Sequence, residues 1–192
     1  MKRYLLVLAI ALGASVWWTA SAQDSTIPIL NPGFEDDVLA CAPGQFCSQY
    51  SITGWLCGPQ SGTFKPSTVN FPTGVPGGVN VAYIGNSSAT GSILQVAPAV
   101  VRASTTYTLT LSVGHRADYA FTGYVAALMA GNATLAYDSS LSPAPGAFLT
   151  DVIVYNSGAT PPQLGHALTI FVKSLGSGQV EIDNVSLSAT PQ

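Results

Sequence analysis

Alternation of apolar and polar residues is clearest between Thr105 and Val113. Tyr107, Leu109, Leu111 and Val113 fall on one face of this segment, and threonine and serine residues fall on the other. A period of two residues is typical of a β-strand that buries one face. The segment therefore predicts a strand at the surface of a hydrophobic core.

Other short apolar or alternating runs are separated by glycine, proline, asparagine and serine. Eight runs could form strands: Ile27–Leu30, Asn80–Ile84, Ser92–Val96, Thr105–Val113, Gly123–Met129, Phe148–Tyr155, Ala167–Lys173 and Gln179–Leu187. Short strands joined by turn residues predict an all-β, antiparallel two-sheet β-sandwich. The segment from Asp37 to Gly78 is expected to form loops over one edge or mouth of this sandwich.

The beginning of the chain has the order of a secretory signal peptide. Lys2 and Arg3 precede an apolar stretch from Tyr4 to Trp18, and small residues follow at positions 20–22. A membrane anchor is the alternative, but a spanning helix needs about 20 apolar residues. We predict a signal peptide at 1–22, a single β-sandwich domain at 23–192, and a secreted or periplasmic protein.

The predicted mature chain is acidic. It keeps all nine acidic residues and only four basic ones, which are Lys65, Arg102, Arg116 and Lys173. Nucleic acids and anionic membranes bind surfaces of positive charge. We therefore expect neither as a partner, and no membrane insertion after signal removal.

The three cysteines, Cys41, Cys47 and Cys57, lie close together in the sequence. In an exported protein this number indicates one disulfide and one remaining thiol. Cys41 and Cys47 flank a turn-forming Ala-Pro-Gly-Gln-Phe segment and are the preferred pair. A pair that includes Cys57 stays open.

Charged residues are rare, and several acidic ones lie near the ends of the mature chain. Glu35 follows the first predicted strand, whereas Glu181 and Asp183 lie in the last one. Apolar residues of that strand fall on even positions before Asp183 and on odd positions after Asn184, so a β-bulge is needed to keep one buried face. A bulge frees carbonyl oxygens, and Ca²⁺ takes about six to eight oxygen ligands. Glu35 and Asp183 could share this ion; alternatively, the acids only solubilise edge strands.

The same residues carry a family resemblance. Asn-x-Gly-Phe-Glu at 31–35, the Gly54-Trp55 pair and the terminal Asp183-Asn184-Val185-Ser186-Leu187 resemble jelly-roll carbohydrate-binding modules with a galactose-binding-like fold. In that family a structural calcium joins the first and last strands. The resemblance implies a jelly-roll topology, calcium as a cofactor, and Glu35 and Asp183 as ligands.

The middle of the chain is similar to a second, related family. Asn80-Val81-Ala82-Tyr83-Ile84-Gly85 and the segment from Val113 to Tyr124 resemble the Stig cyclases, or hapalindole-type cyclases. Those exported, calcium-dependent β-sandwich enzymes cyclise indole–isonitrile terpenoids, using an acid and a pocket of aromatic side chains. The resemblance implies Tyr83 and Phe121 as pocket residues and Asp183 as the acid. This role competes with calcium, because one carboxylate rarely serves both.

Ligand binding needs an accessible aromatic face and a few polar groups. The candidates are Trp55, Tyr83, Phe121 and Tyr124 as aromatic residues, and His115, Arg116 and Asp118 as polar ones. Each has a structural alternative: Trp55 follows a glycine in a compact segment, which favours the core. Arg116 and Asp118 could form an ordinary surface ion pair.

Hydrolytic and nucleotide chemistry have no motif in this sequence, which lacks a Gly-x-Ser-x-Gly segment and a phosphate-binding loop. The leading hypothesis is an exported, calcium-stabilised module that binds glycan or another small ligand. A Stig-type cyclase and an extracellular structural protein are the alternatives. Of these, only the cyclase is an enzyme.

Overall fold

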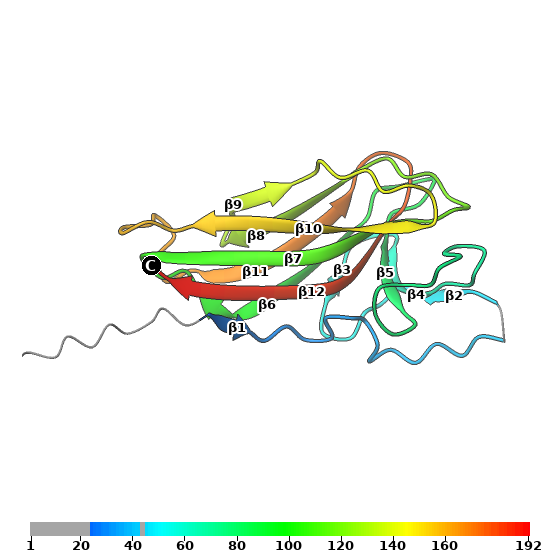
Figure 1. Cartoon of the computed structure of the whole chain (residues 1–192), viewed down its shortest axis with the longest axis horizontal. Coiled ribbons are helices and arrows are strands. Elements are labelled where there is room, and N and C mark those ends of the chain that lie inside the picture. The colour runs from blue at the N-terminus through cyan, green and yellow to red at the C-terminus, as the bar shows by residue number, and fades with distance from the viewer. Residues whose placement is uncertain (1–23, 43–44) are drawn as a thin grey trace, which may run out of the picture.

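A computed structural model describes residues 24–42 and 45–192, which form two antiparallel β-sheets that face each other (Figure 1). The first sheet contains β10 (Ala147–Asn156), β7 (Thr105–His115), β12 (Val180–Pro191), β5 (Val81–Ile84), β4 (Ser61–Lys65) and β2 (Cys47–Gln49) in that order, with β1 (Ser25–Ile27) also paired to β12. The second contains β3 (Leu56–Cys57), β6 (Ser92–Val100), β11 (Ala167–Ser174), β8 (Tyr124–Ala130) and β9 (Ala133–Asp138). The predicted antiparallel jelly-roll β-sandwich is confirmed.

The main core lies between the two sheets. Leu109, Leu111 and Val113 of β7 and Leu168 and Ile170 of β11 are all fully buried members of one cluster. On the opposite face of β7, Thr106, Thr108 and Thr110 are partly buried and Ser112 is buried. The alternation in the sequence therefore identified the core face of both strands.

β12 contains the predicted β-bulge. Asp183 pairs with Ser112 and Ser186 pairs with Thr110, so β12 has one more residue than β7 between these points. Asn184 in the bulge has a φ of 50°, a left-handed conformation that asparagine tolerates. The bulge keeps residues on both sides of it in the main core, and Asp183 points to the opposite face.

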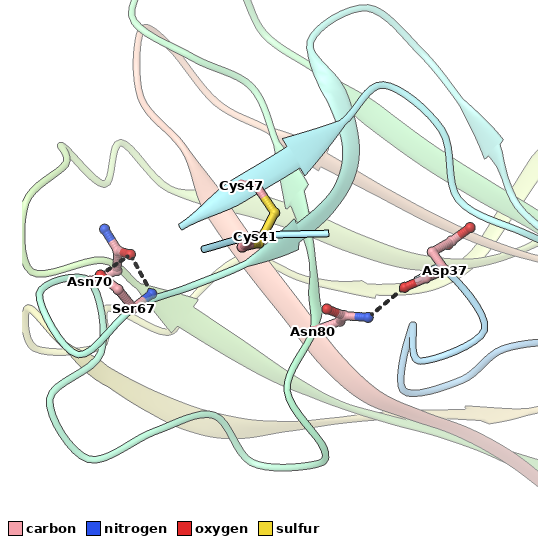
Figure 2. The surroundings of a disulfide bond; sticks show 6 residues. All are labelled: Asp37, Cys41, Cys47, Ser67, Asn70 and Asn80. Carbon is pink, nitrogen blue, oxygen red and sulfur yellow. Dashed lines mark hydrogen bonds between the residues drawn. A yellow bond between two sulfur atoms is a disulfide. The ribbon is translucent and has the colours of Figure 1, made fainter. Parts of the chain in front are cut away.

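The segment between Asp37 and Gly78 is more regular than predicted. The disulfide joins Cys41 and Cys47, with a Cα–Cα distance of 5.8 Å, and Cys57 is free. Figure 2 shows the disulfide at the start of β2. The expectation of loops alone is wrong, because β2, β3 and β4 all lie in this segment.

The first strand is also displaced from its prediction. β1 ends at Ile27, whereas Ile27–Leu30 was expected to be extended, and Pro28 lacks the N–H that would continue the ladder. The predicted signal peptide lies outside the described residues. Within the described part of the chain, no helix is long and apolar enough to span a membrane.

Candidate functional site

The seven-stranded sheet has a second face, directed away from the main core and here called the outer face. Five residues form one row across it through direct strand pairing: Phe148 pairs with Gly114, Gly114 with Glu181, Glu181 with Tyr83, and Tyr83 with Gly62. Side chains of directly paired residues share a face. The space that a side chain would need at the two glycines is taken by the ring of Phe148 at Gly114 and by the backbone of Gln49 at Gly62.

Apolar residues surround this row. Phe64, Val81 and Tyr83 form a buried cluster separate from the main core, and Phe148 packs against it. Phe71 stacks on Phe148 with ring centroids 4.6 Å apart. Phe71 belongs to the segment 66–80, which therefore covers part of the outer face.

Glu181 is the acidic member of the row. Its side chain is 0% exposed, and neither carboxylate oxygen has a hydrogen-bond partner. Burial raises its pKa to about 8, although the positive charge of Arg116 and its backbone N–H, which is nearby but outside hydrogen-bond geometry, act in the opposite direction. A buried, unpaired carboxyl group is costly, and its protonated form is the one that this environment favours.

A pocket of about 140 Å³ opens beside Tyr83. The ring of Tyr50 lies edge-on to that of Tyr83, with centroids 6.2 Å apart. Burial, and then the nearby Tyr50, raises the pKa of Tyr83 to about 12, so its phenol stays neutral. The pocket is lined by Phe46, Ser48, Tyr50, Gln60, Phe64, Tyr83, Asn86, Arg116 and Gln179.

Arg116 is the charged residue in the lining of this pocket. Its Nε and Nη2 donate to the two oxygens of Asp118 at 3.1 and 2.7 Å, and its Nη1 donates to Gln179 Oε1 at 2.8 Å. Its guanidinium carbon lies 4.7 Å from the ring centroid of Phe64 and 5.1 Å from that of Tyr119. Only 9% of Arg116 is exposed. The predicted ion pair exists, but it is not an ordinary surface pair.

Asp118 holds Arg116 in place. Hydrogen bonds from Arg116 keep the pKa of Asp118 below its usual range, although partial burial opposes them. Asn70 Nδ2 also donates to both oxygens of Asp118, at 3.1 and 3.0 Å. The segment 66–80 and the loop after β7 are thereby connected above the outer face.

Glu35 and Asp183 meet at a second place, around the backbone of residues 77–80. Glu35 Oε1 accepts from the N–H groups of Val79 and Asn80 at 2.9 and 2.7 Å. Asp183 Oδ2 accepts from Gly77 at 2.9 Å. Burial raises the pKa of Asp183 to about 6, and the charge of Glu35 adds to this.

This donor set suits calcium in its chemistry. Two carboxylates of like charge lie near each other, one of them fully buried, and Asn80 Oδ1 is a buried oxygen without a hydrogen-bond partner. Hard oxygen ligands of this kind are those that Ca²⁺ prefers. Among the described residues, no three acidic, histidine or cysteine side chains lie close enough together to hold one metal ion. Backbone carbonyls or water would have to complete the coordination.

The other predicted ligand residues lie elsewhere. Trp55 and Tyr124 are buried in the main core, and Phe121 packs against it. The Trp55 Nε1–H donates to the carbonyl oxygen of Leu30 at 3.0 Å, which explains why this aromatic residue faces inward. The ring nitrogens of His115 face the carbonyl oxygens of Pro143 and Tyr119 at 2.9 and 3.2 Å. Of the aromatic candidates, Tyr83 alone belongs to the outer face.

The sequence interpretation missed Glu181 as a site residue. Glu181 and Asp183 alternate with Val180 and Ile182 in the last strand, and acids at alternate positions indicate a face open to solvent. The available signal was the aromatic content of the segments that cover this face. Gln179, Phe64 and Tyr50 were missed as well, because nothing local marks them.

The fold and site together define a jelly-roll β-sandwich with a buried acid beneath an aromatic pocket. The family described as HpiC1-like, HpiC1 cyclase, matches residues 25–188, and the chain belongs to this family. A search of curated proteins gives no significant match.

Solved structures of Stig cyclases are similar over nearly their whole length. FisC from Fischerella sp. TAU is 26% identical with a TM-score of 0.78, and the match covers 88% of this chain and 99% of FisC. A cyclase from Fischerella sp. TAU in complex with 4-(1H-indol-3-yl)butan-2-one is 28% identical with a TM-score of 0.76, covering 87% and 98% of the two chains. The expected relation to Stig cyclases is confirmed.

A carbohydrate-binding module shares the fold. TmCBM61, solved in complex with β-1,4-galactotriose, has a TM-score of 0.52 and 16% identity, with 85% of this chain and 98% of the module covered. At this identity the likeness concerns the fold alone. It confirms the expected structural relation to sugar-binding jelly rolls.

Proposed function

We propose that this protein binds a small aromatic ligand in the outer-face pocket and cyclises it, with Glu181 as the proton donor. The observation that carries this proposal is the fully buried carboxyl group of Glu181, which lacks a hydrogen-bond partner and pairs directly with Tyr83. Structural acids in a folded protein are normally paired or solvated. An acid that is neither is available to donate a proton to a bound molecule.

The surroundings of Glu181 suit acid-promoted cyclisation. A general acid donates a proton most effectively from a fixed position close to the reacting group. Phe64, Tyr83 and Phe148 keep water away from this position and offer aromatic faces to a developing cation. This proposal moves the acid role from Asp183 to Glu181 and leaves Asp183 to the site that it shares with Glu35.

The test is product formation from an indole–isonitrile terpenoid of the kind that Stig cyclases use. Glu181→Gln keeps the size of the side chain but removes the acid, so product should fall at least about a hundredfold while the fold persists. Asp183→Asn, assayed in excess calcium, is the matched control for an acid on the same strand. Product formation by Glu181→Gln at the normal rate would exclude this residue as the donor.

Glycan binding is the second candidate function. Tyr50 is 74% exposed and Phe46 is 55% exposed, and both line the pocket. Exposed aromatic rings beside polar groups are the usual platform for sugar stacking. A glycan array and a titration with 4-(1H-indol-3-yl)butan-2-one show which of the two ligands binds. If the bound ligand is a glycan, Tyr50→Ala should abolish its binding.

We propose calcium as the ion that links Glu35 and Asp183. A ligand bound only by the folded state stabilises it by mass action. Calcium should therefore raise the melting temperature, and a chelator should lower it, in the natural protein but not in Glu35→Gln. A melting temperature that changes with neither calcium nor chelator would count against the metal site.

We also propose that the protein is exported. The disulfide supports this, because such bonds persist in oxidising compartments. Cell fractionation and N-terminal sequencing provide the test, with a mature N-terminus at Gln23 as the expected result. Recovery of an uncleaved chain in the cytoplasm would contradict export.

A further inference from the structure

The proposed function requires a ligand to reach Glu181, but the structure shows this residue sealed. Its side chain is 0% exposed and lines no part of the pocket beside it. The pocket volume of about 140 Å³ is also small, because sites for small organic molecules usually measure about 300–1,000 Å³. A group between the pocket and Glu181 must therefore move before a ligand can bind.

Arg116 is the candidate, because it lines the pocket and donates to Gln179, which lies two residues before Glu181 in the chain. Its charge acts on Glu181, and its guanidinium group lies among the rings of Phe46, Phe64 and Tyr119. Aromatic rings at these distances attract a delocalised cation. The space that a flat ligand would use is occupied by a side chain of the protein itself.

The segment that carries Arg116 is fixed to its neighbours by contacts on the C-terminal side of this residue. The Ala117 N–H donates to the carbonyl oxygen of Asn70 at 2.9 Å, and the Ser87 N–H donates to the Tyr119 hydroxyl at 2.8 Å. Asp118, the partner of the guanidinium group, is about one-third exposed. A rotation of the Arg116 side chain toward solvent would break its hydrogen bond to Gln179 and would need no displacement of a strand.

We propose that Arg116 is the gate of the outer-face pocket. In the closed state its guanidinium group fills the space between Phe46, Phe64 and Tyr119 and covers Glu181. In the open state the same three rings become the walls of a site for a flat aromatic or cationic ligand. This inference rests on the proposed function, because it concerns access to the same acid.

Arg116→Ala tests the gate directly. When only a fraction of the protein molecules is in the conformation that can bind ligand, the observed affinity is lowered by that fraction. Removal of the gate should therefore lower the Kd for 4-(1H-indol-3-yl)butan-2-one about tenfold and raise the association rate. Calorimetry and stopped-flow Tyr fluorescence measure the two effects, and Arg102→Ala, an exposed arginine outside the pocket, is the matched control.

Asp118→Asn provides a second variant in case Arg116→Ala does not fold. It weakens the hold on Arg116 without emptying the pocket, so the Kd should fall by a smaller factor. If the natural protein binds the ligand and neither variant binds it more tightly, Arg116 is not a gate, whereas the proposed function still stands. No binding by any of the four proteins would overturn both.

Discussion

Gly114 lies beside Glu181 on the outer face, and its lack of a side chain has a steric reason. A Cβ atom there would collide with the ring of Phe148, which stacks on Phe71. Gly114→Ala should therefore lower the free energy of unfolding by about 1–3 kcal/mol, as overpacking does elsewhere. Urea unfolding measures this change.

Gly33→Ala is the control, because the nearest atom to its added Cβ would be 3.8 Å away. The two variants share the chemical change and differ in the space available. Equal stability of the two proteins would mean that Phe148 moves without cost.

The raised pKa of Glu181 predicts how stability depends on pH. The folded state holds a proton on this group up to a pKa of about 8, whereas the unfolded chain releases it near the ordinary value of 4.5. The folded state thus binds more protons in between, so the free energy of unfolding should fall as pH rises from 6 to 8. Glu181→Gln should remove most of this slope, as measured by urea unfolding at several pH values.

Burial raises the pKa of Asp183 to about 6, so this group titrates mainly below the range from pH 6 to 8. Asp183 therefore contributes little to the pH dependence of the free energy of unfolding in this range. Asp183→Asn is therefore expected to keep the slope. A slope that is the same with and without Glu181 would show that this carboxyl group titrates as an ordinary one.

Only some of the individual site residues could be predicted from the sequence. It predicted that Tyr83 and Arg116 take part in a site, and both line the pocket. It did not predict the burial of Glu181, because its neighbours across the sheet, Tyr83 and Gly114, lie far from it in the sequence. Trp55 and Tyr124 were candidates for the site, but their rings fill the main core, as the context of Trp55 had favoured.

β2 is the shortest strand that borders the pocket, and the disulfide supports it. Cys47 begins β2, and Phe46 and Ser48 on either side of it line the pocket. Replacing both Cys41 and Cys47 by serine should lower the free energy of unfolding by about 2 kcal/mol, the amount expected for a short loop. Ligand affinity should fall as well, since the position of Phe46 depends on this link.

Cys57→Ser is the control for the loss of a sulfur atom, because Cys57 is free and only half-buried. Urea unfolding without reductant measures all three proteins. Equal stability of the disulfide variant and the natural protein would show that the short loop is fixed by other contacts.

Elements with a clear period were predicted well, and irregular ones were not. The sequence of β7 alternates from Thr105 to Val113, and its core face was correctly identified. β4 has the sequence Ser-Gly-Thr-Phe-Lys, with no apolar alternation, yet its first four residues are buried because other segments cover both of its faces. Such a strand is specified by tertiary packing rather than by its own pattern.

The two sheets are joined at one open edge by a polar contact. The Tyr124 hydroxyl on β8 lies 2.7 Å from Asp151 Oδ2 on β10 and 3.1 Å from Asp138 Oδ2 on β9. Burial raises the pKa of Asp151, so its carboxyl group depends on this hydroxyl as a partner. The contact ties the five-stranded sheet to the seven-stranded one.

Tyr124→Phe should lower the free energy of unfolding by about 1–3 kcal/mol, because Asp151 loses a buried hydrogen-bond partner. Tyr137→Phe removes the same group from an exposed tyrosine on β9 and should have little effect. Thermal melting compares the two. A Tyr124→Phe protein as stable as the natural one would show that water replaces the hydroxyl.

The whole molecule separates two carboxylate sites on the outer face. Glu35 and Asp183 lie at residues 77–80, whereas Glu181 lies between Gly114 and Tyr83 in the row across the sheet. The chain contains no other glutamate besides Glu35 and Glu181. A protein labelled with ¹³C at the glutamate carboxyl carbon should therefore give one signal from each proposed site.

This labelled protein tests directly whether Glu181 belongs to the ligand site and Glu35 to the calcium site. Addition of 4-(1H-indol-3-yl)butan-2-one should shift the signal that is absent from Glu181→Gln, and addition of calcium should shift the other. A ligand that leaves the Glu181 signal in place while it binds, or that shifts the Glu35 signal instead, would contradict the assignment of the outer-face pocket as the functional site.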